Sequence, residues 1–254
     1  MLQKIVMTGE GPTDMGTCNN SQAICTDNQL DVGPVALLMF KTIQQYLPNW
    51  NIDNLEQENV ASHLTLIDET WLISKCKEKK RGLIRPSKAV AKGMTVHAQR
   101  AQVLAEYAQS NNHQMAAYFH DTDGTRSQLE DMPDRQEKLT QAIKAGFRAA
   151  KFENQGLAIV PKPTSEAWLI CGVKESPYQH CGLLETNLSG NDNSPNRAPK
   201  AVLGEILGNS KYTRSDLNDL VDQLDPEKID MPSFNDLCHQ IKTAIRAICG
   251  EVAS

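Results

Sequence analysis

Short apolar runs alternate with segments of helical periodicity along the first 170 residues. The apolar runs predict strands at residues 2–8, 61–67, 114–119 and 156–160. Apolar positions three and four residues apart predict helices at 32–47, 95–109 and 134–151, and a further helix that opens at 165. Strands alternating with helices of this length pair in parallel through right-handed crossovers. The pattern therefore predicts an α/β fold, with a parallel sheet flanked by helices.

The last third of the chain has a different pattern. Residues 185–200 are rich in Asn, Ser, Pro and Gly and predict a loop or linker. Beyond this segment, helical periodicity returns at 201–208, 215–224 and 234–249. We therefore expect an α/β core over residues 1–184, and a linker with a small C-terminal helical appendage over 185–254.

Composition places the chain among ordinary globular proteins. It has 254 residues, of which 40% are hydrophobic, and a formal net charge of −5. No apolar run approaches the roughly 18 residues that a membrane span needs, and the N-terminal sequence lacks the pattern of a signal peptide. We expect a cytoplasmic protein without a membrane partner, and a homo-oligomer is open. The seven cysteines include no C-x-x-C pair, which favours buried reduced thiols over disulfides or a zinc site.

The net charge hides a strong local asymmetry. Residues 1–70 carry a net charge of −7, whereas residues 71–110 carry +7. Most of the positive charge lies in the basic segment 75–93. A charge run is usually a solvated surface, but Lys and Arg are also the residues that contact nucleic-acid phosphates. Both interpretations stay open, and the candidate nucleic-acid contacts are Lys77, Lys79, Lys80, Arg81, Arg85 and Lys88.

Acidic residues follow three of the four predicted strands. Glu10 and Asp14 come after the first strand, Asp121 and Asp123 after the third, and Glu166 after the fourth. The loops at the carboxyl ends of parallel strands converge, so we expect these carboxylates at one edge of the sheet. Carboxylates held together repel one another, and a divalent cation removes that cost. Oxygen ligands of this kind suit Mg²⁺ or Mn²⁺.

Two motifs among these residues carry a family resemblance. The sequence Glu10-Gly-Pro-Thr-Asp14 after a first strand, with Asp121-x-Asp123 after a later one, resembles the Toprim domain of topoisomerases, primases and certain nucleases. The likeness is closest to stand-alone nucleases of the OLD (overcoming lysogenization defect) type, and it covers roughly residues 1–200. It implies a Toprim-like Rossmannoid sheet and a metal-dependent endonuclease that acts on nucleic acid, and DNA is favoured over RNA without the sequence deciding between them. It also implies a place in bacterial anti-phage defence.

The resemblance extends more loosely to the later motifs. Glu166 matches the third acidic element, with Thr164 at the position of its hydroxyl residue. Lys200 matches the downstream lysine, while Lys162 and Lys174 remain alternatives for that role. OLD proteins carry an ATPase on the same chain, and this chain has no P-loop motif, so the resemblance implies a separate ATPase partner or none. It implies the metal ligands Glu10, Asp14, Asp121, Asp123 and Glu166, and catalytic roles for Glu10, Asp121, Asp123 and Lys200.

Two other functions compete with this interpretation. Residues 121–125 read D-x-D-G-T, the string of haloacid-dehalogenase-type phosphatases, in which Asp121 would be the nucleophile and Asp123 the acid and base. That alternative requires a later strand ending in paired aspartates, which the sequence does not offer. The third possibility is a Toprim module that binds or assembles without catalysis. His97 and His120 are expected to be ordinary surface or hydrogen-bonded residues, and Trp168 is expected to be a core residue of the helix that carries Glu166.

Overall fold

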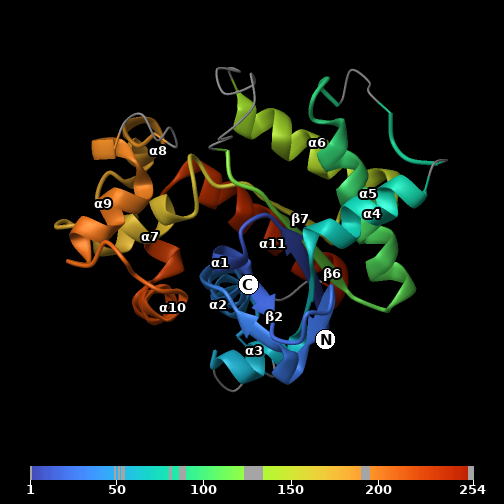
Figure 1. Cartoon of the computed structure of the whole chain (residues 1–254), viewed down its shortest axis with the longest axis horizontal. Helices are drawn as coiled ribbons and strands as arrows, with labels where there is room; N and C mark the ends of the chain where they lie inside the picture. The colour runs from blue at the N-terminus through green and yellow to red at the C-terminus, as the bar shows by residue number, and fades with distance from the viewer. Residues whose placement is uncertain are drawn as a thin grey trace.

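A mostly parallel sheet forms the centre of the molecule (Figure 1). The computed structural model describes residues 2–48, 50, 52, 55–79, 82–85, 90–122, 134–189 and 195–250. Within them, a five-stranded sheet has the order β3-β5-β1-β6-β7. β1 (Ile5–Gly9), β5 (Leu64–Ile67), β6 (Met115–Phe119) and β7 (Gly156–Ile159) are parallel, and β3 (Ile24–Thr26) runs antiparallel to β5. This arrangement confirms the predicted α/β class and is consistent with a Rossmann-like fold.

Helices cover both faces of this sheet. One hydrophobic cluster joins the sheet to α4 (Glu69–Glu78), α5 (Thr95–Ser110) and α6 (Arg135–Ala149). A second cluster joins the opposite face to α2 (Pro34–Tyr46) and α11 (Pro232–Cys249). Both faces of the parallel strands are therefore buried, which is why these strands read as continuous apolar runs in the sequence.

The strand residues alternate strictly between these two clusters. Ile5 and Met7 of β1 face α2 and α11, whereas Val6 between them faces the α4–α6 side. In β6, Phe119 takes the first face and Tyr118 the second, and both are fully buried. The alternation fixes the register of the sheet, because a shift by one residue would exchange the two sets.

The remaining elements are short and lie around the sheet. α3 (Gln57–His63) leads directly into β5, so residues 61–63, predicted as part of a strand, are the end of a helix. β2 and β4 form a small antiparallel pair that the apolar pattern did not predict. Figure 1 shows α7 to α10 grouped on one side of the sheet. The bounds are α1 Pro12–Met15, β2 Gly16–Cys18, β4 Leu30–Val32, α7 Glu166–Val173, α8 Leu184–Asn187, α9 Pro199–Ile206 and α10 Arg214–Gln223, with 3-10 turns at Asp27–Gln29, Cys181–Leu183, Pro195–Arg197 and Pro226–Lys228.

The predicted C-terminal appendage is not confirmed, because α11 packs on the sheet itself. Phe234 and Ile241 of α11 are fully buried in the same cluster as β1 and β7. The side chain of Gln240 accepts a hydrogen bond from the Ala158 N–H at 2.8 Å and donates one to the Ala158 carbonyl at 3.1 Å. It thereby pairs the outward-facing backbone groups of Ala158 on the edge strand β7.

Four cysteines form disulfides, so the prediction of reduced thiols is wrong for them. Cys18 is bonded to Cys25, and Cys171 to Cys181, with Cα–Cα distances of 5.6 and 5.3 Å. The partners are brought together by the β2–β3 turn and by the end of α7, which spacing in the sequence does not reveal. Disulfides persist mainly in oxidising compartments, so the cytoplasmic location stays a prediction that these two pairs do not support. In the described parts of the chain, no helix has the length and apolar character needed to span a bilayer.

Candidate functional site

The strand order reverses between β1 and β6, and this reversal sets the position of the site. The chain connects β1 to β5 on one side and returns to place β6 and β7 on the other. At such a point the loops that follow the two neighbouring strands diverge and leave a crevice at their carboxyl ends. Glu10 follows β1 directly, and Asp121 lies two residues after β6. The predicted acidic residues are therefore found at the edge where open α/β sheets bind ligands.

Two glycines allow the chain to make this edge compact. A Cβ atom on Gly9 would lie 2.1 Å from the carbonyl oxygen of Phe119, so only glycine permits the ends of β1 and β6 to lie this close. Gly11 has φ of 81° and begins the turn into α1, which carries Asp14 back toward the edge. The Gly-x-Gly spacing around Glu10 is thus required by the geometry that presents both acidic side chains.

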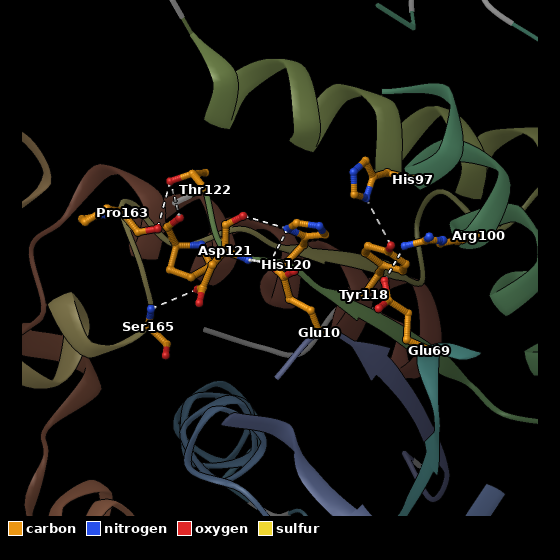
Figure 2. A network of polar contacts seen from close by, with 11 residues as sticks. Glu10, Glu69, His97, Arg100, Tyr118, His120, Asp121, Thr122, Pro163 and Ser165 are labelled. Atoms are coloured by element: carbon orange, nitrogen blue, oxygen red, sulfur yellow. Dashed lines mark hydrogen bonds and ion pairs between the residues drawn. The ribbon is translucent and has the colours of Figure 1, made fainter. Parts of the chain in front are cut away.

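The predicted acidic residues are linked by hydrogen bonds through Ser165. The Asp121 N–H donates to Glu10 Oε1 at 3.0 Å, and the Ser165 N–H donates to Asp121 Oδ1 at 3.1 Å (Figure 2). The Ser165 hydroxyl donates to Asp14 Oδ1 at 2.5 Å. One serine thus joins the carboxylates that follow β1 and β6. Sequence reasoning did not identify Ser165, although it immediately precedes Glu166.

Buried negative charge is concentrated at Asp14 and Glu166. Glu166 is 3% exposed, and its Oε2 atom has no hydrogen-bond partner among the described residues. Burial, followed by the charge of Glu166, raises the pKa of Asp14 to about 6, against the opposing effects of Ser165 and Lys200. Lys200 Nζ lies 3.9 Å from Glu166 Oε1, and its side chain is 73% exposed. Burial also raises the pKa of Tyr212, with smaller contributions from Glu166 and Asp14.

Contacts with α11 hold α7, the helix that carries Glu166, in place. Trp168 of α7 is fully buried, as predicted, and its indole N–H donates to the Ser233 hydroxyl on α11 at 2.9 Å. Its ring packs edge to face against Phe234, with centroids 5.2 Å apart. These contacts fix the orientation of α7, and therefore the depth at which the Glu166 carboxylate is buried.

The donor set suits a hard divalent cation in its chemistry. Carboxylate and hydroxyl oxygens are typical Mg²⁺ and Mn²⁺ ligands. The Glu166 Oε2 atom is buried with no hydrogen-bond partner among the described residues, and the exposed Lys200 reaches only the other oxygen of this carboxylate. The described residues contain no group of three or more His, Cys, Asp and Glu side chains close enough to hold a metal ion. Asp123, predicted as a fifth acidic ligand, lies outside the described residues.

Two lysines of the basic segment lie toward the opposite edge of the sheet from this acidic cluster. Lys77 is in the last turn of α4, which begins at the carboxyl end of β5. Lys79 forms an ion pair with Glu106, on the half of α5 that leads to the start of β6. Arg85 is exposed. Lys80, Arg81 and Lys88 lie outside the described residues.

A groove of about 470 Å³ opens on the other side of Glu10. Its walls are the loops after β1 and β5, including Asp68 and Glu69, and the segment from Ser21 to Ala23 next to the Cys18–Cys25 disulfide. The groove therefore gives a ligand access to Glu10 from the β5 side.

A set of neutral and basic side chains lies next to Glu10. His120 Nδ1 is 2.7 Å from Glu10 Oε1 and 2.7 Å from the Asp121 carbonyl oxygen. The His97 ring packs edge to face on His120, with centroids 4.4 Å apart, and its Nδ1 lies 3.2 Å from the Tyr118 hydroxyl (Figure 2). The sequence analysis treated both histidines as ordinary residues. Their position, at a helix start and after a strand end that share one sheet edge, is the signal that could have identified them.

The fold and this edge together define an α/β protein with a buried acidic cluster at the switch point of its sheet. Comparisons with protein-family models, with curated proteins and with solved structures give no match for this chain. The D-x-D-G-T alternative requires a later strand ending in paired aspartates, and in the described residues β7 is the last strand and is followed by Val160, Pro161 and Lys162.

Proposed function

We propose that this chain is a divalent-metal-dependent nuclease that hydrolyses nucleic-acid phosphodiesters through a Toprim-type acidic cluster. The observation that carries the proposal is the buried Glu166 carboxylate, with one oxygen unpartnered, next to an Asp14 whose pKa is raised to about 6. Such an arrangement costs stability unless a cation neutralises it. The hydrogen-bonded connection of this pair through Ser165 to Asp121 and Glu10 supports one continuous site rather than scattered acidic residues.

Each residue of the cluster has a defined task in this proposal. Glu10, Asp14, Asp121, Asp123 and Glu166 are the candidate ligands of Mg²⁺ or Mn²⁺ in this proposal; of the four that the structure describes, no three lie close enough together to hold an ion as they stand. The bound cation would supply Lewis-acid stabilisation of the phosphate oxygens and lower the pKa of a water molecule. Ser165 positions Asp14 and Asp121 by donating to both. Lys200, exposed and close to Glu166, would donate to the phosphate oxygens and offset the negative charge that develops on them.

The partners follow from the resemblance to OLD-type Toprim nucleases. The proposed substrate is DNA rather than RNA, with a separate ATPase subunit in a bacterial anti-phage system. The Toprim identity of the sheet belongs to the same proposal. Its support is the agreement between the family pattern and the positions of Glu10, Asp14, Asp121 and Glu166 at one edge.

Cleavage of plasmid DNA in the presence of Mg²⁺ or Mn²⁺ tests this proposal. Glu166→Gln keeps the shape of the side chain but removes its charge, so we expect cleavage to fall by about 100-fold, as when a single charge-stabilising group is removed. Glu175→Gln is the matched control, because Glu175 is exposed shortly after α7. Cleavage that survives a chelator, or that Glu166→Gln leaves at the control level, would refute the proposal. Release of phosphate from a generic phosphomonoester without DNA cleavage would favour the phosphatase alternative.

A further inference from the structure

Two donors hold one oxygen of the Glu10 side chain. The Asp121 N–H donates to Glu10 Oε1 at 3.0 Å, and His120 Nδ1 lies 2.7 Å from the same oxygen (Figure 2). His120 and Asp121 are neighbours directly after β6, whereas Glu10 directly follows β1. The loop after one strand thus holds the acidic side chain that follows the adjacent strand of the sheet. His120 has no task in the metal-binding proposal.

A neighbouring carbonyl group determines which atom carries the proton between His120 and Glu10. His120 Nδ1 is also 2.7 Å from the Asp121 carbonyl oxygen, which can only accept a hydrogen bond. An unprotonated Nδ1 would direct its lone pair at both oxygens, so Nδ1 carries a hydrogen and shares it between them. Nδ1 bears this hydrogen whether the ring as a whole is neutral or charged. Glu10 Oε1 is therefore the acceptor of both bonds.

The His120 ring is held in this position by its surroundings. The residue is 9% exposed, and its backbone N–H donates to the Ile159 carbonyl of β7 at 3.0 Å. The His97 ring packs edge to face on His120, with centroids 4.4 Å apart, and His97 Nδ1 lies 3.2 Å from the hydroxyl of the fully buried Tyr118. Burial, followed by the charge of His120, lowers the pKa of His97 to about 2, so the packed ring is neutral and adds no charge repulsion.

The two oxygens of the Glu10 carboxylate are therefore not equivalent. Both hydrogen bonds from the described residues fall on Oε1, while the side chain is 37% exposed beside the groove. Fixing Oε1 restricts rotation of the carboxylate, which removes conformational freedom that a glutamate would otherwise lose on binding a ligand. Oε2 is then the oxygen that remains for a ligand.

We propose that His120 is a positioning residue for Glu10, which anchors Oε1 and leaves Oε2 as the single Glu10 oxygen that contacts the cation. The inference rests on the proposed function, because it takes Glu10 to be one of the cation ligands. It adds that cation affinity depends on the Nδ1–H of His120 as well as on the acidic residues. Hydrogen-bonding partners of metal ligands contribute about 10- to 100-fold to metal affinity.

The metal-free wild type tests the position of the proton. Histidine side-chain NMR of ¹⁵N-labelled protein distinguishes a protonated Nδ1 from an unprotonated one, and the spectrum of His120→Asn assigns the resonance by its absence. We expect a hydrogen on His120 Nδ1 that exchanges slowly with solvent, because the ring is buried. An unprotonated Nδ1 would overturn the inference without reference to any measurement of cleavage.

Two substitutions at His120 separate the donor from the ring. Asparagine places an amide N–H close to the position of Nδ1–H but has no ring, whereas phenylalanine keeps a ring and has no donor. Calorimetry with Mg²⁺ or Mn²⁺ should show about 10- to 100-fold weaker binding in His120→Phe, and His120→Asn should recover most of this loss. In plasmid cleavage at subsaturating cation, His120→Phe should lower kcat and leave KM for DNA unchanged, because His120 acts through Glu10.

The matched control is His239→Phe, which changes an exposed histidine on α11. It should bind the cation as the wild type does, and thermal unfolding shows whether each variant is folded. Equal cation affinity in His120→Phe and His239→Phe, or equal losses in His120→Phe and His120→Asn, would overturn the inference. If His120→Phe does not fold, His120→Asn decides: affinity near that of the wild type upholds the inference, and a loss as large as that of Glu10→Gln overturns it.

The outcome for His120 can be separated from the outcome for the nuclease. A wild type that binds the cation but does not cleave DNA would refute the nuclease function, while the cation affinities of the His120 variants still decide the positioning role. A wild type that cleaves DNA, with His120→Phe indistinguishable from it in cation affinity and kcat, would refute this inference alone. A wild type that binds no cation would refute both.

Discussion

Asp14→Asn should stabilise the metal-free protein, and increasingly so as the pH rises. The Asp14 carboxyl has its pKa raised from 3.8 to about 6, chiefly because it is buried and close to Glu166. Ionising a carboxyl with such a shift costs the folded state about 3 kcal/mol. Asparagine removes the charge and keeps an oxygen that can accept from the Ser165 hydroxyl. The benefit should therefore be absent at low pH and largest where Asp14 would be ionised.

The sign of this pH dependence follows from proton binding in the two states. Between pH 4 and 6 the folded protein retains a proton on Asp14 that the unfolded chain has released, so the stability of the wild type falls as the pH rises. Above about pH 6 both states are ionised and the difference becomes constant. Urea unfolding at half-unit steps from pH 4 to 8, with a chelator present, should show the stability gain of Asp14→Asn rising to about 3 kcal/mol and then levelling.

A control and a metal titration complete this experiment. Asp219→Asn, at an exposed position on α10, should leave the pH profile of stability unchanged. Mg²⁺ or Mn²⁺ should stabilise the wild type more than Asp14→Asn, because a ligand that binds only the folded state adds its binding free energy to stability. If Asp14→Asn and the wild type differ in unfolding free energy by the same amount at pH 4 and at pH 8, the reasoning is refuted. Such a result would show that ionising Asp14 does not destabilise the folded protein.

Three further changes test how the structure supports the site. Gly9→Ala should destabilise the protein by about 3 kcal/mol or more in urea unfolding, because its methyl group would lie 2.1 Å from the Phe119 carbonyl; a neutral result would mean that β1 and β6 are further apart. Replacing both Cys171 and Cys181 by serine should lower the free energy of unfolding by about 3 kcal/mol, which is the entropic contribution of closing a ten-residue loop. Identical thermal unfolding of the oxidised and the reduced wild type would argue against the disulfide. Phe234→Ala should cost about 3–5 kcal/mol and unfold sheet and α11 together; two separate transitions would restore the appendage that the sequence suggested.

The parallel strands were predictable because both of their faces are buried. A strand covered by helices on each side is apolar at nearly every position, so β6 and β7 appear in the sequence as apolar runs, and β1 as a run in which the buried Thr8 is the polar exception. β3 was not predictable in this way, because it has three residues at the sheet edge and one of them is buried. α11 was predicted as a helix, but whether its apolar stripe packs on the core or on a partner stayed open, since such a stripe shows that a face is covered without showing what covers it.

The candidate site was predictable only where topology determines position. Glu10, Asp121 and Glu166 follow strands whose carboxyl ends share one edge, so a parallel sheet brings them together whatever the details. Ser165 could not be found in this way, because its role depends on the backbone N–H and hydroxyl pointing to two different carboxylates. His97 could not be found in this way either, because its packing on His120 and its contact with the Tyr118 hydroxyl depend on side-chain directions that the chain order does not determine.

Glu10 joins the acidic cluster to His120, and this position determines what a Glu10 variant can show. Its Oε1 atom accepts from the Asp121 N–H and lies 2.7 Å from His120 Nδ1, so changing Glu10 would remove both contacts at once. Among the contacts of the described residues, Glu166 has none with His120, and it is linked to Asp14 and Lys200 instead. Loss of activity in a Glu10 variant therefore cannot distinguish loss of a metal ligand from displacement of His120 and Asp121, whereas loss of activity in Glu166→Gln reports on the acidic cluster alone.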